Sequence, residues 1–201
     1  MTASTKTKKK GIRAARKEAR PREIVEAALE VFSRDGFAGA RLDDVADRVG
    51  ISKGTIYLYF DTKEELFKAC VRQTIGVHIK GTQELAAHFE GPTADLLREI
   101  VQGIGMRLTS GDFQTILILM ISEGKRFPEV VSFYFEEIIT TGLSLLRGVV
   151  QRGIDRGEFR DNGLCQSPQL LVSPVMMSVI WNHLFVNEGG RLDVENFLRT
   201  H

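Results

Sequence analysis

The 201-residue chain lacks long apolar runs, and none approaches the roughly 18 to 20 residues that a membrane-spanning helix needs. Its first twenty residues are basic but have neither the apolar core nor the small-residue cleavage site of a secretory signal. With 43% hydrophobic and 26% charged residues, the composition is that of a globular protein and not of a disordered one. We therefore expect a soluble cytoplasmic protein with no membrane partner.

Cysteine is scarce, and the two that occur, Cys70 and Cys165, lie far apart in the sequence. They show neither CxxC spacing nor a nearby histidine, so the pattern indicates neither a disulfide scaffold nor a zinc site. We interpret both as buried free thiols, with a redox switch between them as the alternative. No metal and no cofactor are expected.

The chain also lacks the residue combinations that catalysis needs, such as a nucleophile with its base, a glycine-rich phosphate loop or metal-ligand spacing. An enzyme would have to use Cys70 as a nucleophile, or acid and base chemistry around His183. A core or interface position is the more ordinary interpretation of His183. We therefore predict that the protein is not an enzyme.

What the chain does contain is an uneven distribution of charge. Residues 1–22 hold nine Lys or Arg and one Glu, and residues 1–63 hold fourteen basic against nine acidic residues. Residues 64–201 hold thirteen basic against seventeen acidic residues, so only the first part favours a polyanion. Because residues 1–19 are Lys-rich and without periodicity, we expect a disordered basic arm over 1–19, followed by domains over 20–66 and 67–201.

Three short helices are expected after the arm. Apolar residues recur at helical spacing from Ile24 to Phe32 until Gly36 stops the run. A second stripe, which Gly50 ends, consists of Leu42, Val45, Ala46 and Val49. These patterns predict two helices, the second of them only about two turns long.

A third helix is expected after Ser52, an N-cap residue type, with Ile56 and Phe60 on its inner face. Two short helices joined by a tight turn are typical of a helix-turn-helix, although a helical hairpin in a core has the same pattern. Gly54 and Leu58 point directly outward, with Tyr57 and Asp61 on one flank and Thr55 on the other, so the face lacks the long charged residues of a solvated helix. The uncharged residues of this face suit close approach to DNA and contact with base edges better than they suit solvent.

Residues 22–67 carry these motifs in order around the sequence GFAGARLDDVADRVGISKGTIYLYFDTKEELF. In this arrangement the stretch resembles the DNA-binding domain of the TetR (tetracycline repressor) family of bacterial transcription regulators. The resemblance implies an all-helical homodimer, with an amino-terminal three-helix DNA reader and a carboxy-terminal helical domain that binds a small effector. It also implies DNA contacts from the third helix and its flanks, at Lys53, Gly54, Thr55, Tyr57, Tyr59 and Lys63.

Residue chemistry gives these positions separate roles. Lys53 and Lys63 bracket the third helix and suit phosphate groups. Tyr57 and Tyr59 can donate their hydroxyls to phosphate oxygens, although Tyr59 is equally compatible with a core position. Thr55 and Leu58 are better placed for base edges. The full predicted set is Arg41, Ser52, Lys53, Gly54, Thr55, Tyr57, Leu58, Tyr59 and Lys63.

One position departs from the family pattern. The family usually has two small hydroxyl residues before the second helix, where this chain has Ala40 and Arg41. A Ser or Thr at 41 would form a capping box with Asp44, but Arg41 cannot accept that hydrogen bond, so we predict a lost cap. A guanidinium can instead reach a phosphate in bidentate fashion, with a merely tolerated Arg41 as the alternative.

The remainder of the chain shows helical periodicity broken by glycine and proline, without strand-like alternation, so the fold class is expected to be all-α. A long helix is expected from Lys63 towards His88. Later helices are expected at about 93–108, 113–123, 129–155, 168–186 and 194–199. Pro174 is expected either to kink its helix or to mark its real start.

An effector cavity is expected among these helices. Adaptable apolar residues of the kind that line pockets also occur as ordinary core, and the candidates are Met106, Met120, Phe133, Met176 and Trp181. Because no cluster of buried charges selects another class, an apolar or aromatic molecule is the simplest effector.

Dimerisation is expected as well, because three short helices read about one half-site and useful affinity needs two readers. In the family the last two long helices pair between subunits, which maps onto about 129–155 and 168–186. The candidate contacts are Gly142, Leu145, Leu146, Val149, Val179 and Ile180.

The hypothesis that follows is an effector-controlled transcription regulator, most simply a repressor that a small molecule releases from a palindromic double-stranded DNA operator. A ligand that promotes DNA binding by favouring the DNA-competent state is equally allowed physically. An architectural DNA-binding protein without an effector is the third possibility, and the large acidic second domain argues against it.

Overall fold

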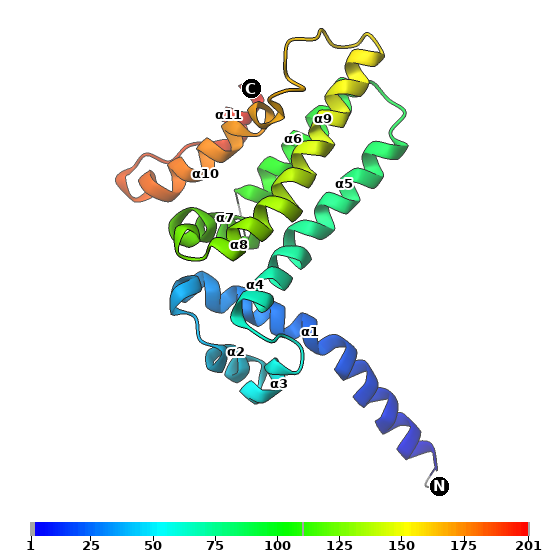
Figure 1. Ribbon diagram of the computed structural model, residues 1–201, viewed down its shortest axis with the longest axis vertical. Helices are drawn as coiled ribbons and strands as arrows, with labels where there is room; N and C mark the ends of the chain where they lie inside the picture. The colour runs from blue at the N-terminus through cyan, green and yellow to red at the C-terminus, as the bar shows by residue number, and fades with distance from the viewer. Residues whose placement is uncertain (1–2, 110, 201) are drawn as a thin grey trace. The chain divides into compact units, whose positions relative to one another are not determined.

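The computed structural model describes residues 3–109 and 111–200, with side chains over 19–109 and 111–197. All regular secondary structure of the described residues is helical, which confirms the predicted fold class. The chain divides into two compact units, Met1–Gln73 and Thr74–His201 (Figure 1). The expected boundary after residue 66 falls inside helix α4 (Lys63–Val71), whose Phe67 packs on Phe32 and Phe37 of the first unit.

The first unit begins with α1 (Ala3–Gly39), which is bent at Gly36. The bend glycine has φ 72° and ψ 171°, outside the helical range and in a region that favours glycine. Residues 3–19 are part of this helix, which differs from the expected disordered arm, whose residues 1–2 lie outside the described part. Residues 6–20 are mainly Lys, Arg, Ala and Glu, and all four are strong helix formers.

The bend positions the aromatic core of the first unit. Phe32 and Phe37 lie on either side of it with ring centroids 5.5 Å apart, and Phe67 meets them edge-on at 5.3 and 5.2 Å. Aromatic pairs of this geometry contribute about 0.5–1.5 kcal/mol beyond area burial. Buried aliphatic residues of α1 and α2, together with Ile56, complete the core.

Helices α2 (Leu42–Val49) and α3 (Lys53–Tyr57) lie beside each other (Figure 1). The predicted stop at Gly50 is confirmed: its φ is 71°, and the next amide, Ile51 N–H, donates to the Ala46 carbonyl at 2.9 Å. The predicted cap is confirmed too, because Ser52 Oγ accepts from the Thr55 amide at 3.3 Å.

The second unit begins within the π-helical turn η1 (Arg72–Gly76) and is helical throughout its described regular structure. Its elements are α5 (Val77–His88), α6 (Thr93–Leu108), α7 (Gly111–Glu123), η2 (Gly124–Arg126), α8 (Pro128–Phe133), the π-helical η3 (Tyr134–Ile139), α9 (Thr140–Asp155), η4 (Pro168–Leu171), α10 (Ser173–Phe185), η5 (Val186–Glu188) and α11 (Val194–Thr200). Pro174 lies in the first turn of α10, so it marks the start of that helix.

The core of the second unit forms where α6 and α9 run side by side (Figure 1). Leu96 and Ile100 of α6 pack with Leu146 and Val149 of α9. The residues expected as one helix over 129–155 are helical from Pro128 to Asp155 with the η3 stretch inside. Within the described ranges, no helix is both long and apolar enough to span a membrane.

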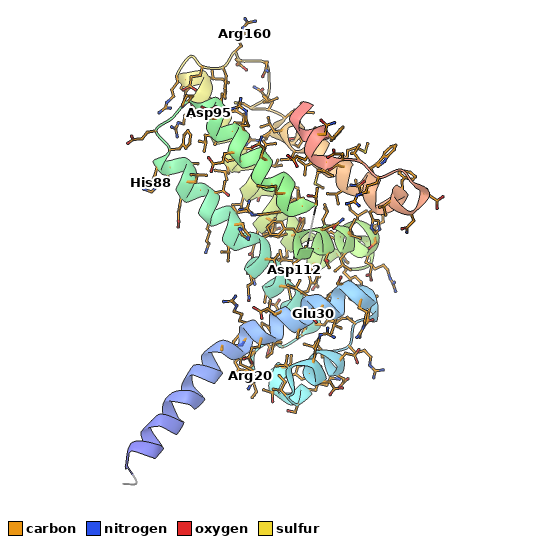
Figure 2. All side chains as sticks on the ribbon, turned by 180° about the vertical axis from the view of Figure 1, so that it is seen from behind. Arg20, Glu30, His88, Asp95, Asp112 and Arg160 are labelled. Carbon is orange, nitrogen blue, oxygen red and sulfur yellow. The ribbon has the colours of Figure 1, made fainter. Side chains whose placement is uncertain are left out.

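Long-range polar contacts close the ends of these helices, at the end of the unit where Figure 2 shows His88 and Asp95. The Arg152 guanidinium donates to the carbonyls of Ala86 and Phe89 at the end of α5. The Glu158 carboxylate accepts from both the amide and the hydroxyl of Thr93, which is fully buried at the start of α6. These contacts satisfy backbone groups that the helices leave unpaired.

Candidate functional site

The outer face of α3 is exposed in the first unit. Leu58 is 81% exposed and Tyr57 is 46% exposed, and Gly54 is also exposed, whereas Ile56 is fully buried. The side chains of Ser52 and Thr55 share a hydrogen bond of 2.9 Å. Tyr59 is half-buried, which is intermediate between the two interpretations of its sequence position, an exposed phosphate contact and a core residue. An exposed leucine beside an exposed tyrosine gives this short helix a surface that solvent alone does not favour.

Gly54 has no structural need to be glycine. A Cβ at this position would meet only Ser52 Oγ, at 3.8 Å, which is ordinary van der Waals contact. The missing side chain therefore leaves space on the outside of α3 rather than inside the fold. Such space allows another molecule to approach the backbone closely.

Charged residues flank this face in a compact group. Lys53 Nζ donates to Asp43 Oδ2 at 2.9 Å, a hydrogen bond that raises the pKa of Lys53 and lowers that of Asp43. The Arg41 charge also lowers the pKa of both groups. The predicted loss of the cap on α2 is confirmed, since Arg41 makes no side-chain cap hydrogen bond. The Arg41 guanidinium therefore does not cap α2.

Lys63 holds a position that the sequence did not indicate. Its Nζ donates to the carbonyls of Ala38 and Ala40, at 3.2 and 3.1 Å, and lies 4.9 Å from the centroid of Phe37. A cation suits the carbonyls at the end of a helix, so Lys63 stabilises the join between α1 and α4. These two hydrogen bonds use two of the three N–H donors of the ammonium group. The predicted contact with a phosphate would have to use the third.

A second candidate site is a cavity of about 320 Å³ inside the second unit. Side chains from α5, α6, α7, η3, α9 and α10 surround it, and most are apolar, among them Ile79, Ile104, Leu108, Phe113, Ile138 and Leu143. Its polar lining includes Tyr134, whose burial raises the pKa of its phenol to about 12 and keeps it neutral. Burial, and then the charge of Arg107, lower the pKa of His78.

Met176 lines this cavity, whereas the other four predicted pocket residues are not part of its described lining. Met106 is 70% exposed, Met120 is half-buried, and Phe133 is buried outside the lining. The Trp181 indole is partly exposed and donates to the Gly190 carbonyl at 2.6 Å. The actual lining is rich in isoleucine and leucine. In a helical sequence these residues do not distinguish a pocket from an ordinary core.

Several predicted subunit contacts are wrong. Leu146, Val149 and Val179 are buried within the unit, and Gly142 lines the cavity, so these positions face the chain's own interior. Leu145 packs against the same core, and Ile180 is half-buried. The same segments nevertheless expose large apolar side chains, namely Val131, Phe135, Met177, Trp181, Leu184 and Phe185.

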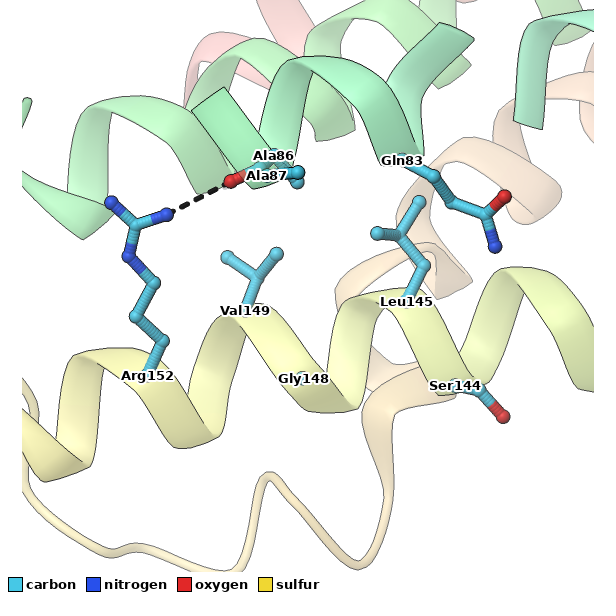
Figure 3. Close-up of a pocket in the computed structure, with 8 residues that line it drawn as sticks. All are labelled: Gln83, Ala86, Ala87, Ser144, Leu145, Gly148, Val149 and Arg152. Atoms are coloured by element: carbon cyan, nitrogen blue, oxygen red, sulfur yellow. Dashed lines mark hydrogen bonds between the residues drawn. The ribbon is translucent and has the colours of Figure 1, made fainter. Parts of the chain in front are cut away.

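A shallower groove of about 370 Å³ lies between α5 and α9 (Figure 3). Its lining includes the small residues Ala86, Ala87 and Gly148, with the Arg152 guanidinium at one end. That guanidinium is already engaged with the Ala86 carbonyl at 2.9 Å and with Phe89. The Arg152 guanidinium is therefore less available to a ligand, and the apolar cavity is the better candidate for a binding site.

Cys70 is fully buried and its thiol donates to the Val25 carbonyl at 3.6 Å, but Cys165 is only partly buried. Neither cysteine forms a disulfide in the described part of the chain. His183 is exposed, so a core position for it is wrong. Over the described ranges, no group of three or more His, Cys, Asp or Glu residues could hold a metal ion.

Comparison with known families matches both units. Residues 24–70 match the family described as "Bacterial regulatory proteins, tetR family". Residues 95–194 match the "AefR-like transcriptional repressor, C-terminal domain". The first match covers all of α2, α3 and the turn between them, and the second covers most of the elements that line the cavity.

Individual relatives agree with these matches. The HTH-type transcriptional regulator YfiR of Bacillus subtilis, itself uncharacterised, is 28% identical over 72% of this chain and 70% of its own. The fatty acid metabolism regulator protein of the same organism is 27% identical over 72% of this chain and 74% of its own. The solved structure of FadR from B. subtilis with stearoyl-CoA has a TM-score of 0.72 at 21% identity, covering 89% of this chain and 93% of that one.

Both halves of the chain thus point to one family, whose members control transcription and are not enzymes. The protein belongs to the TetR family of bacterial transcription regulators.

Proposed function

We propose that the protein is a homodimeric repressor that binds a palindromic operator through α3 and is released when a small effector occupies the cavity of the second unit. The observation that carries this proposal is the outer face of α3, where Tyr57 and Leu58 are exposed around a glycine that the fold does not require. Such a regulator works on the chromosome, and we infer that it acts in the cytoplasm.

The exposed face supports insertion of α3 into the major groove. Leu58 can contact a thymine methyl, and the Gly54 backbone can approach the DNA closely. Tyr57 can donate its hydroxyl to a phosphate. Arg41, Lys53 and the remaining donor of Lys63 supply cations for the backbone, which contribute sequence-independent, salt-dependent affinity.

The exposed apolar residues of α8, η3 and α10 support dimerisation. Phe135, Met177, Trp181 and Leu184 are large exposed apolar side chains of the kind that subunit interfaces cover. A two-fold dimer places two readers on successive turns of DNA, about 34 to 36 Å apart, and so requires a palindromic site.

The enclosed apolar cavity supports control by a ligand. At about 320 Å³ it lies at the lower end of the size range of small-molecule pockets. A neighbour of the same fold, FadR of B. subtilis, has been solved with stearoyl-CoA. A ligand that favours one of two dimer geometries needs a coupling of only about 1–3 kcal/mol to change DNA affinity roughly 5- to 150-fold.

Selection of DNA from a random pool by the purified full chain tests this function. We expect enrichment of a palindrome, and Tyr57→Ala should bind the enriched duplex about tenfold more weakly while sedimenting as the same dimer. Tyr57→Phe serves as the matched control that removes only the hydroxyl. A pool without an enriched palindrome, or undiminished binding by Tyr57→Ala, would contradict the proposal.

A further inference from the structure

The charged side chain of the described cavity lining is a cation, Arg107. His78 of α5 and Arg107 of α6 are both part of its lining, and both residues are exposed. The described lining contains no Asp or Glu. The Arg107 guanidinium forms no ion pair with any described residue, and its one hydrogen bond goes to the Gly103 carbonyl at 2.9 Å. The His78 ring has no hydrogen-bond partner among the described residues and lies 5.3 Å from the Phe113 ring.

Gly103 gives the Arg107 guanidinium its place. A Cβ at Gly103 would approach Arg107 Nη1 to 2.9 Å, closer than real Cβ atoms come to a neighbour. The absence of a side chain therefore lets the guanidinium fold back onto α6, where it takes part in the cavity lining. Because Nη1 is the far end of a flexible side chain, a Cβ at Gly103 would move the guanidinium aside at little cost to the fold. The glycine itself costs up to about 1 kcal/mol of helix stability relative to alanine.

A largely apolar site with one arginine, a neighbouring imidazole and no acid is suited to an anion. Because Arg107 is exposed, an acid can keep its charged end near water while its apolar body enters the cavity. The guanidinium fork pairs best with a planar group of two oxygens. A carboxylate has this geometry. The small cavity volume then limits the remainder of the ligand to a compact apolar body.

We propose that the cavity binds a compact apolar carboxylic acid, aliphatic or aromatic, with its carboxylate at Arg107 and His78. This inference rests on the proposed function in taking this cavity as the effector site. Arg107 and His78 are then ligand-binding residues, and Gly103 is a positioning residue that acts through Arg107.

Calorimetric titration of the purified full chain with matched ligands tests the proposal. Decanoate and 2-naphthoate should bind, decanol should bind at least about tenfold more weakly than decanoate, and decylamine should not bind. Arg107→Gln should weaken decanoate binding roughly 10- to 100-fold and leave decanol binding unchanged. Equal affinity for decanoate and decanol, or no binding of either acid at about 1 mM, would overturn the proposal.

Gly103→Ala is the second variant, because it keeps the charge and displaces it. We expect weaker binding of decanoate with a melting temperature that is unchanged or higher, which a purely structural role for Gly103 would not give. Tighter binding of decyl phosphate than of decanoate overturns the choice of a carboxylate. Binding of decanoate that leaves operator affinity unchanged keeps this inference and overturns release by an effector, so the two failures are distinguishable.

Discussion

The two units of this chain carry their candidate sites in opposite ways. In the first unit the site faces outward, so Leu58 and Tyr57 occupy positions where solvent would favour charged residues. In the second unit the site faces inward, and its lining consists of the same isoleucine, leucine and phenylalanine residues that form a core. An outward site is therefore visible in the sequence as an exception, whereas an inward site follows the ordinary pattern of burial.

The sharpest way to break this comparison is to fill the cavity of the second unit without touching the first. Gly142 lines the cavity, and a Cβ there would meet no described atom within 4 Å. We expect Gly142→Leu to retain operator affinity and to lose ligand binding altogether, because its side chain occupies the ligand's space. Fluorescence anisotropy with and without decanoate measures both. Gly148→Leu is the control, because Gly148 is an exposed position of α9 outside the lining of this cavity.

A charge on the outer face of α3 should have the next largest effect. Leu58→Glu places a carboxylate against the DNA phosphates, and we expect operator affinity to fall about 100-fold, or about 2.7 kcal/mol. Because Leu58 is 81% exposed, thermal unfolding should be unchanged. Leu58→Gln is the matched control, because glutamine has nearly the size of glutamate without its charge. A folded Leu58→Glu with full affinity would remove α3 from the interface.

The two lysines that bracket α3 offer a matched pair. Lys63→Met should lower the free energy of unfolding by about 1 kcal/mol, since Lys63 donates to Ala38 and Ala40, and should also flatten the salt dependence of DNA binding. Lys53→Met should affect only DNA binding, because its partner Asp43 is an exposed acid. Chemical denaturation and salt titrations measure the difference. Equal stability of the two variants would argue against the role of Lys63 at the end of α1.

The smallest expected effect is that of a single methyl group. Gly54→Ala should leave stability unchanged or slightly higher, because the fold has room for the Cβ. If the DNA backbone or a base approaches at this point, operator affinity should nevertheless fall a few-fold. Parallel melting and binding curves decide the matter, and a variant that binds as tightly as the native chain places Gly54 away from DNA.

Prediction from sequence succeeded where a local rule fixes a residue type. Gly50 ends α2 in the left-handed conformation and Ser52 caps α3, because few other residues do either. Prediction failed where the decisive neighbour is distant in the chain. Lys63 reaches carbonyls 23 and 25 residues away, and the Glu158 carboxylate binds Thr93 across 65 residues. No periodicity encodes such pairs.

The cavity shows the same limit in another form. Met176 was found because methionine is a typical pocket residue, but Met106 and Trp181 have the same character and lie at the surface. Arg107 was missed because one arginine on a helix is ordinary. Its signal was the glycine four residues earlier, whose meaning depends on where the guanidinium lies.

In the proposed complex with DNA, the ion pair between Asp43 and Lys53 would affect how the protein searches a chromosome. Every phosphate must compete with an acid that already holds the lysine, so a casual encounter with DNA gains less than a bare ammonium would provide. Under the proposal, only a sequence that also pairs with the side chains on the outer face of α3 would compensate for breaking the ion pair. Competition from the Asp43 carboxylate would then shorten the dwell time on non-operator DNA more than the dwell time on the operator. The ion pair would in this way increase the selectivity for the operator.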